Sequence, residues 1–465
     1  MKTLLSLGCF VALLALVPAA PAGEFKAGAA AVVITPPAGT PLAGYYSFRA
    51  ADGVLDDLYA KAVVVEQDGA KAALVTLDLI TTTRPMVAAA RQLIAEQTGI
   101  APERVMISAT HSHTGPVLPR GSRIDELTGG QTPPALDYSA KLPALIARAV
   151  ADANAKLAPA RASTTVGHED GLSFNRRFWF QDGTLAWNPP KLDPRIARPA
   201  GPTDPDVGVL YLETAAKSAE PLACYVNFAM HPDVVGGTKI SADYPGALAR
   251  RLADYKGANM VALFANGCCG NLNHRNIAWS DSQRGMREAD RIGTELAGAV
   301  FRSWPGLRPM KPFAPRARAA LVTLPRPKFT EQEIADAGAV VARMTDPKIG
   351  TVPKAKAFCT IDTVAKKDAP LEVEVQAIAF NDDLAVVSLP GEIFVELGLA
   401  IKKASPFKHT FIAELANGSI GYIPNRSAYA EGNYEVVSAR CAEGSGEMLV
   451  DAAVKLLKEL ARQGR

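Results

Sequence analysis

The sequence has little net charge, and the two signs are mixed along it. Its 465 residues include 50 basic and 47 acidic side chains, which give a formal net charge of +3. Such a chain lacks the concentrated basic surface that nucleic-acid binding requires. Hydrophobic residues make up 48% of the chain and charged residues 21%, which is typical of a globular protein with a substantial core. We therefore expect no nucleic-acid partner, and no obligate protein partner is indicated.

Long apolar runs are absent after the first residues of the chain. Lys2, an apolar run over residues 4–17 and small residues up to Ala22 form the pattern of a secretory signal peptide. We predict that residues 1–22 are a signal peptide and that the mature chain, residues 23–465, is secreted or periplasmic. A membrane anchor is the alternative, but the run is shorter than the roughly 20 residues that a span needs.

Cysteine is scarce, and its spacing excludes a common kind of metal site. After residue 22 no pair has the C-x-x-C spacing of a structural zinc site. Adjacent cysteines are hard to bridge without strain, and an odd total leaves at least one thiol without a partner in the chain. We expect small buried residues at these five positions: Cys224, Cys268, Cys269, Cys359 and Cys441.

Apolar segments with strand periodicity alternate with segments of helical spacing. This alternation predicts an α/β fold, with a mixed β-sheet core covered by helices. The predicted strands are 25–34, 58–66, 72–78, 105–109, 207–212, 222–230, 259–264, 371–380, 384–389 and 410–415, and the predicted helices are 83–98, 138–157, 244–255, 285–304 and 447–462.

The composition changes between residues 310 and 370, where proline, lysine and short elements dominate. Thr330 and Glu333 have the spacing of a capping box and predict a helix that extends to Met344. The region has the character of an inserted subdomain or a lid, although peripheral packing is the simpler interpretation.

Two of the six histidines follow the predicted strand 105–109 directly. His111 and His113 are two residues apart, so in an extended segment both rings point the same way. Ligands of α/β proteins commonly bind where strands end. A pair of ordinary hydrogen-bonded histidines is the alternative, because the His-x-His spacing alone is a weak signal.

Other polar residues also follow apolar strands and stand close to glycine or proline. These residues are His231, Glu392 and Tyr422. Two imidazoles and a carboxylate are a ligand set that holds catalytic zinc and leaves a coordination position open. The residues can meet only if one sheet gathers the strand ends. The alternatives are a capped histidine at position 231 and a surface carboxylate in a Pro-Gly turn at position 392.

Several short motifs occur in a fixed order between about residue 28 and residue 440. Together they resemble the conserved blocks of the neutral (non-lysosomal) ceramidase family. The motifs are Gly53–Ala62, Ser108–Pro116, Asn175-Arg176, Phe228–Pro232, Ser241–Gly246, Pro390–Glu392 and Leu415–Ile423, followed by Tyr434-Glu435.

The resemblance implies a zinc-dependent amidohydrolase and assigns roles to individual residues. The substrate would be a ceramide-like lipid or another N-acylated small molecule, and peripheral membrane contact is compatible with it. A metal-activated water would attack the amide. The alternatives are a zinc hydrolase of another amide or an ester, and a non-catalytic exported binding protein. The implied zinc ligands are His111, His231, Glu392 and Tyr422; His113 and Arg176 would act on substrate, and Asn175 would bind it. Asp78 and Asp243 would orient ligands, with simple loop hydrogen bonding as the equal alternative for both.

Two features depart from the family pattern. Asn273 stands where the family has a serine, and an amide cannot be a nucleophile, although it can donate a hydrogen bond to an oxyanion. We also expect no counterpart of the family's C-terminal β-sandwich domain, so that residues 23–465 form a single catalytic domain.

Overall fold

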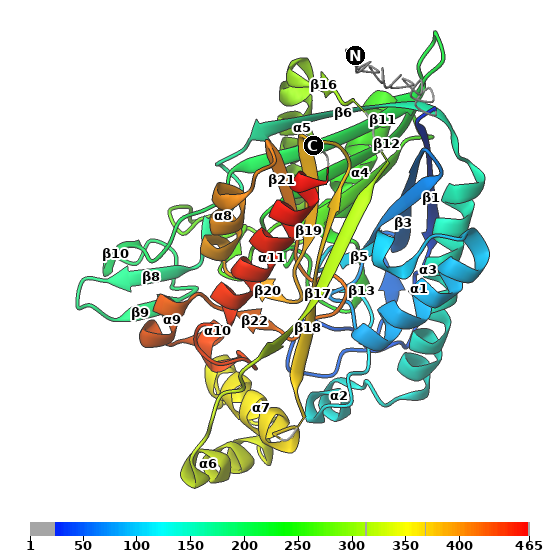
Figure 1. Cartoon of the computed structure of the whole chain (residues 1–465). Helices are drawn as coiled ribbons and strands as arrows, with labels where there is room; N and C mark the ends of the chain where they lie inside the picture. The colour runs from blue at the N-terminus through cyan, green and yellow to red at the C-terminus, as the bar shows by residue number, and fades with distance from the viewer. Residues whose placement is uncertain (1–23, 312–313, 368, 464–465) are drawn as a thin grey trace, which may run out of the picture.

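Three sheet faces surround a shared core in the computed structural model, which describes residues 24–311, 314–367 and 369–463 (Figure 1). The predicted signal peptide lies outside these residues. The larger sheet, nine-stranded within the described residues, bends where β1 (Lys26–Val33) meets β6 (Ala158–His168). Only two residue pairs are in register at this junction, Lys26 with Pro159 and Ala27 with Ala158. The bend divides the sheet into an N-terminal limb and a central limb.

The N-terminal limb has the strand order β1-β3-β4-β5. Its first three strands are antiparallel, and β5 (Val105–Ala109) is parallel to β4. The predicted strands 58–66 and 72–78 are present and form a hairpin: β3 (Tyr59–Gln67) turns into β4 (Ala70–Leu77) through Asp68 and Gly69, both with positive φ. The outer face packs against α1 (Arg84–Thr98) and α3 (Pro133–Ala155).

The central limb has the order β14-β12-β11-β6, with β16 (Arg308–Pro309) paired to β6. β11 (Asp206–Thr214) is antiparallel to β12 (Pro221–Phe228), and β14 (Val261–Asn266) is parallel to β12. The outer face packs against α4 (Asp243–Lys256) and α5 (Met286–Ser303).

The third face is a separate C-terminal sheet of the order β17-β18-β19-β21. Its outer face packs against α8 (Val395–Ala404) and α11 (Ser445–Arg462). The strands are β17 (Arg316–Leu324), β18 (Leu371–Ala379), β19 (Leu384–Ser388) and β21 (His409–Ala413).

The inner faces of both limbs and of the C-terminal sheet share one apolar core. Leu74, Tyr225 and Phe411, one from each face, belong to the same buried cluster. β14 also lies against β3, β4 and β5, so the limbs fold toward each other. Strands buried on both faces explain why several of them are apolar almost throughout.

Shorter elements complete the described chain. The helices are α2 (Arg123–Thr128), α6 (Glu331–Val341), α7 (Thr351–Ala365), α9 (Arg426–Glu431) and α10 (Tyr434–Val437), with 3₁₀ turns at Pro102–Arg104 and Trp304–Gly306; the strands are β2 (Gly53–Val54), β7 (Phe174–Asn175), β8 (Arg177–Phe180), β9 (Leu185–Trp187), β10 (Ile196–Pro199), β13 (Lys239–Ile240), β15 (Leu272–Asn273), β20 (Glu392–Ile393) and β22 (Tyr422–Ile423).

The predicted fold class is confirmed, with differences in detail. The helix predicted from residue 138 begins at Pro133, because proline is well suited to the first helical position. The predicted capping box of Thr330 and Glu333 is present. β17 and α7 were not predicted from the sequence, because neither has the clear periodicity of a half-buried element.

The five cysteines of the described chain are all buried, and none forms a disulfide. They therefore serve as small buried residues, as expected. Within the described residues, no helix combines the length and the apolar character that a membrane span requires.

Candidate metal and active site

The loops that carry the predicted ligands meet at one end of the three sheet faces. His111 follows β5, His231 follows β12, and Glu392 follows β19. The strand ends are tied together: Asn266 Nδ2 donates to the Thr110 carbonyl at 3.4 Å. The expectation that one sheet gathers them is corrected, since Glu392 and Tyr422 lie on β20 and β22, a separate pair of parallel strands, whereas His111 and His231 follow strands of the bent sheet.

Two of the histidines are held by backbone carbonyls. His111 Nδ1 lies 2.7 Å from the Ile80 carbonyl oxygen, and His231 Nδ1 lies 2.8 Å from the Cys269 carbonyl oxygen. A carbonyl oxygen only accepts, so each Nδ1 carries the proton and each Nε2 presents a lone pair. Partners of this kind typically fix the tautomer and the ring orientation of metal-binding histidines.

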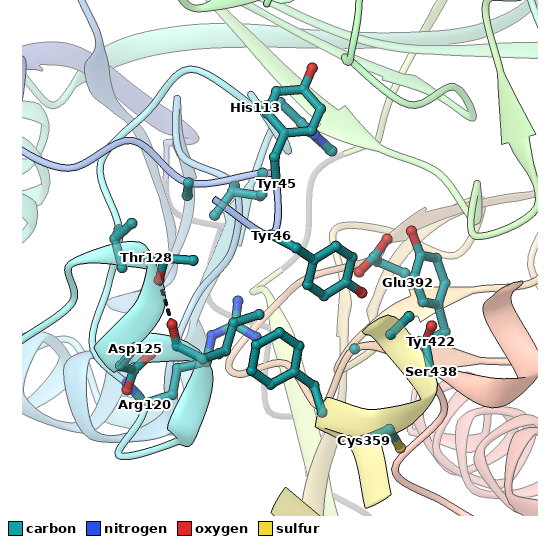
Figure 2. A pocket seen from close by; sticks show the side chains of 18 of the residues that line it. Tyr45, Tyr46, His113, Arg120, Asp125, Thr128, Cys359, Glu392, Tyr422 and Ser438 are labelled. Atoms are coloured by element: carbon teal, nitrogen blue, oxygen red, sulfur yellow. Dashed lines mark hydrogen bonds between the residues drawn. The ribbon is translucent and has the colours of Figure 1, made fainter. Parts of the chain in front are cut away.

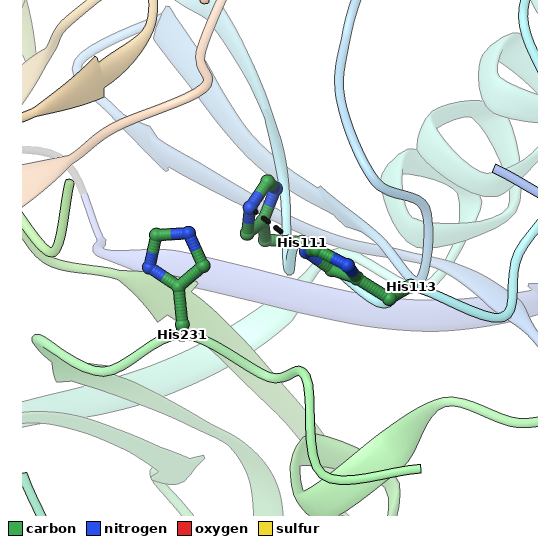
Figure 3. Close-up of side chains that lie close together, drawn as sticks. All are labelled: His111, His113 and His231. Atoms are coloured by element: carbon green, nitrogen blue, oxygen red, sulfur yellow. Dashed lines mark hydrogen bonds between the residues drawn. The ribbon is translucent and has the colours of Figure 1, made fainter. Parts of the chain in front are cut away.

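The lone pairs of these rings point at other acceptors. His231 Nε2 lies 3.2 Å and His111 Nε2 3.4 Å from the same Glu392 oxygen, Oε2. His111 Nε2 also lies 3.3 Å from His113 Nε2. Figure 3 shows the three rings turned toward one another. Acceptors placed this close repel one another unless a cation lies between them.

The separations match those of a metal site. Tetrahedral ligands at about 2.0–2.1 Å from zinc are about 3.3 Å from one another. The ligand nitrogens of His111, His113 and His231 all lie within 4.8 Å of one another, and all three residues are buried. The chain therefore presents a buried group of histidines that could hold a metal ion.

Electrostatics favour the protonation states that a metal requires. Burial lowers the pKa of His113 to about 4 and that of His231 to about 3, with His111 nearby adding to both effects. Burial opposes ionisation of Glu392, but the adjacent His111 and His231 outweigh it and hold its pKa well below the usual value. At pH 7 the site therefore offers neutral imidazoles at His113 and His231 and a carboxylate at Glu392.

Tyr422 lies beside Glu392, as the prediction required (Figure 2). Burial and the neighbouring Glu392 raise the pKa of its phenol well above the usual value, although Arg176 opposes this. The phenol therefore keeps its proton at pH 7 and can donate to Glu392. The Arg176 guanidinium lies 5.4 Å from the centre of the Tyr422 ring.

Arg176 is close to the site, but several of its donors are already engaged. Its Nε donates to Glu435 at 2.8 Å and one terminal nitrogen donates to the Gly270 carbonyl at 2.6 Å. Burial would lower the pKa of Arg176, but Tyr422 and Glu435 outweigh it and raise that pKa. Arg176 therefore places a fixed positive charge against the Tyr422 ring.

His113 differs from the other two histidines in how its ring is held. Its Nδ1 makes no hydrogen bond within the described residues and lies 3.5 Å from Asp233 Oδ1. Tyr45 donates to the same oxygen at 2.5 Å. Burial would raise the pKa of Asp233, but His113 and Tyr45 outweigh it and lower that pKa. An ionised carboxylate therefore faces His113, and the sequence analysis missed it.

The two residues predicted to orient ligands occupy different surroundings. Asp243 accepts from the backbone amides of Val234 and Val235 at 2.9 and 2.8 Å, so it holds the loop that follows His231. Asp78 accepts from the Tyr59 amide at 3.0 Å and lies 3.6 Å from Lys61. Asp78 does not contact His111 directly; the loop that follows it provides the Leu79 and Ile80 carbonyls that bind the His111 backbone and ring.

The side-chain amides of Asn175 and Asn273, both predicted to act at the active site, make hydrogen bonds to neighbouring loops. Asn175 Nδ2 donates to the Pro202 carbonyl at 3.1 Å, and Asn273 Nδ2 donates to Asn188 at 2.9 Å. Asn273 nevertheless forms an isolated parallel bridge with His231, so its backbone lies beside a candidate ligand. The roles predicted for both asparagines remain predictions.

Glu414 is a buried carboxyl that sequence reasoning did not single out. Its Oε2 accepts from the amides of Cys269 and Ile393 at 3.1 and 2.8 Å. It therefore fixes the residue whose carbonyl orients His231 and the residue next to Glu392. Only its position near the end of the predicted strand 410–415 could have indicated a role.

A cavity of about 170 Å³ opens on this cluster. His111, His113, Glu392 and Tyr422 line one side of it, and Figure 2 places Arg120 and Asp125 on the opposite side. Apolar and aromatic side chains line the space between, among them Tyr46, Val117, Leu118, Ile124 and Phe358. α7, in the region of shifted composition, supplies Phe358 to this wall.

Comparisons with known proteins support the fold. No family model matches the chain, and no curated protein matches it in sequence. The crystal structure of neutral ceramidase from Pseudomonas aeruginosa is similar, with a TM-score of 0.74 and 20% identity over 95% of this chain and 75% of that chain. A structure of ceramidase complexed with C2 gives 0.74 and 19%, over 95% of this chain and 76% of that chain. The expected likeness to ceramidases is therefore confirmed as a shared fold.

Proposed function

We propose that this chain, on the fold it shares with neutral ceramidases, is an exported zinc-dependent hydrolase that cleaves an N-acyl amide bond of a lipid-like substrate. Water adds to the amide carbonyl, the C–N bond breaks, and the products are a carboxylic acid and an amine. The fold alone does not establish a reaction, so the proposal depends on the site.

One observation carries the proposal. The lone pairs of His111 Nε2 and His231 Nε2 both face Glu392 Oε2, at 3.4 and 3.2 Å, and no described group donates a proton between them. Because these distances equal the edges of a zinc tetrahedron, the three side chains fit a divalent cation.

We assign His111, His231 and Glu392 as protein ligands. The fourth ligand is Tyr422 in the resemblance to ceramidases, whereas the geometry also admits His113. We favour Tyr422, because the Nδ1 atom of His113 has no carbonyl partner of the kind that holds the other two rings.

A zinc ion bound there would polarise the amide carbonyl and lower the pKa of a water molecule toward 7. His113 would then work on the substrate side. With Asp233 facing its Nδ1, the neutral ring has a lone pair on Nε2, which can take a proton from the attacking water. Asp233 would stabilise the resulting imidazolium.

Tyr422 lines the cavity, and the positive charge of Arg176 lies against the Tyr422 ring. Arg176 keeps its charge through Glu435, and the protonated Tyr422 phenol lies against Glu392. Both groups are preorganised to stabilise the negative charge that develops on the carbonyl oxygen. Asn273, whose backbone pairs with His231, cannot act as a nucleophile, so the attack is by water.

The experiment combines metal analysis with a hydrolysis assay. Purified protein should contain about one zinc per chain and should hydrolyse N-acylsphingosine or a shorter N-acyl amine. His231→Ala should lose both properties, and Arg123→Ala, an exposed arginine paired with Glu126, is the matched control. A zinc-free protein that binds N-acyl lipids without turnover would favour a non-catalytic binding protein. Turnover of esters alone would favour an esterase on this fold.

A further inference from the structure

A second cavity adjoins the candidate active site and is lined by positive charge. It has a volume of about 310 Å³. Arg120 and Arg440 line both this cavity and the one that opens on the histidines. Arg84, Arg326 and Lys366 add further positive charge to its wall. The two arginines therefore stand at the boundary between the cavities.

The carboxylates around the two arginines are already paired. Asp362 accepts from Arg440 at 3.1 Å and from the Arg123 amide at 3.2 Å. Asp125 accepts from the amides of Arg120 and Ser122, at 2.7 and 3.0 Å, as part of the cap of α2. Glu374 forms a two-pronged pair with Arg91 at 2.9 Å for both contacts.

Arg120 is left without a partner of opposite charge. Its guanidinium makes no hydrogen bond or ion pair with any residue that the structure describes. The side chain is accessible to solvent, yet it lies deep in the concavity. Loss of surrounding water and the nearby Arg440 lower the pKa of its guanidinium, although Glu392, Asp125 and Asp362 oppose this. Arg440 keeps its pair with Asp362, so Arg120 is the cation at this boundary that can accept an anionic ligand.

The space between the metal cluster and Arg120 is apolar. Tyr46 and Phe358 stack with ring centres 5.7 Å apart, and Leu118 and Ile124 lie in the same wall. A molecule that filled both cavities would therefore meet three environments in sequence. Its amide would lie at the histidines, an apolar segment would follow, and its far end would reach the arginines.

We propose that the preferred substrates carry an anionic group, a carboxylate, sulfonate or phosphate, separated from the scissile amide by an apolar segment and bound between Arg120 and Arg440. This inference rests on the proposed amide hydrolysis and names its substrate class. Guanidinium groups suit such anions because they offer several donors in one plane. Unmodified ceramide, which has no charged group, would leave this second cavity without its matching ligand.

The test uses two matched pairs of amides with the holoenzyme. In the first pair the charge is on the amine side: the hexanoyl amides of 6-aminohexanoic acid and of 6-aminohexanol. In the second pair it is on the acyl side: the hexyl monoamide of adipic acid and the hexyl amide of 6-hydroxyhexanoic acid. We expect kcat/KM to be about tenfold or more higher for the anionic member of at least one pair, as a charge-assisted hydrogen bond would provide.

Substitutions at Arg120 connect the preference to the site. Arg120→Gln should bring the ratio of the two kcat/KM values close to one, and Arg120→Lys should retain most of it. Arg120 makes no contact that the fold requires, so these variants should melt near the wild-type temperature. Arg123→Ala, an arginine three residues away that lines neither cavity, should keep the full ratio.

A binding measurement separates this inference from the proposed function. Calorimetric titration of the zinc-free protein with the same four amides detects the preference without turnover. Hydrolysis of all four compounds at equal rates would overturn the anionic substrate class while leaving amide hydrolysis in place. Selective binding of an anionic member without hydrolysis would leave the class intact and overturn amide hydrolysis. Equal binding of both members in both pairs, or an unchanged preference in Arg120→Gln, refutes the inference.

Discussion

His113 and His231 lie within the same cluster, and substitution of each should have a different consequence. His231 is a proposed ligand: its Nδ1 is bonded to a carbonyl at 2.8 Å and its Nε2 lies 3.2 Å from Glu392. His113 is proposed to act on substrate, because its Nδ1 makes no hydrogen bond to the part of the chain that the structure describes and lies 3.5 Å from Asp233. Replacement of each by alanine separates metal binding from turnover.

The expected magnitudes follow from these contacts. Loss of a residue that only orients a ligand reduces metal affinity by about 10–100-fold. Loss of a ligand should exceed this, so His231→Ala should bind zinc at least about 100-fold more weakly, which is about 2.7 kcal/mol. His113→Ala leaves the contacts of His231 and Glu392 unchanged, so its zinc affinity should fall by less than about tenfold. Its kcat should still fall by about 100–10,000-fold, the usual contribution of a general base.

The assay measures both properties on the same preparations. Zinc content is determined after dialysis against a weak chelator, and kcat is determined with an N-acyl amine at saturating zinc. If His231 binds zinc and His113 acts on substrate, His113→Ala should contain one zinc per chain and His231→Ala none. Loss of zinc from both variants to the same extent would refute it and would make His113 the third nitrogen ligand.

Three further predictions concern the framework of the site. Glu435→Ala leaves the buried Arg176 and Arg177 without their shared carboxylate, so it should lower the free energy of unfolding by about 3–5 kcal/mol in urea titrations. The control Glu443→Ala, at an exposed ion pair, should lower it by less than about 1 kcal/mol. Equal losses in the two variants would contradict this prediction. Gly270→Ala would place a Cβ 2.5 Å from the Glu392 carbonyl oxygen and should weaken zinc binding about tenfold or more. The control Gly338→Ala, with open space around the new Cβ, should not change zinc binding. Unchanged zinc affinity in Gly270→Ala would count against the close packing of residue 270 on Glu392. Burial raises the pKa of Asp243 to about 7, so the folded chain keeps a proton that the unfolded chain loses near pH 4. The stability of the fold should therefore fall as the pH rises from about 4 to about 7, and Asp243→Asn should remove that part of the slope of melting temperature against pH. An identical slope in the variant would show that the carboxyl is ionised throughout this range.

Local patterns in the sequence were enough to locate most strands and helices. The hairpin of β3 and β4 was predictable from alternation and from Asp68-Gly69, because these signals concern neighbouring residues. α1 was predictable at both ends, where Thr83 caps the first turn and Gly99 adopts the left-handed conformation that ends it. α7 was missed because a helix packed on several sides has no single apolar stripe.

The candidate ligands were also predictable in part, since polar residues at the ends of apolar strands are few. His111, His231 and Glu392 were chosen on that pattern, and the structure brings them within hydrogen-bonding distance. Asp233 and Glu414 were missed. Each is an ordinary acidic residue in the sequence, and its partner is distant: Tyr45 is 188 residues from Asp233, and Cys269 is 145 residues from Glu414.

The sequence by itself determined where the strands end and which imidazoles and carboxylates stand at those ends, because burial periodicity and turn chemistry act over a few residues. Only the tertiary structure decided that a bent sheet and a second sheet direct those ends to one point. It also decided that Arg120 and Arg440 face a common space. Such convergence depends on how apolar faces pack across hundreds of residues, and no local pattern records it.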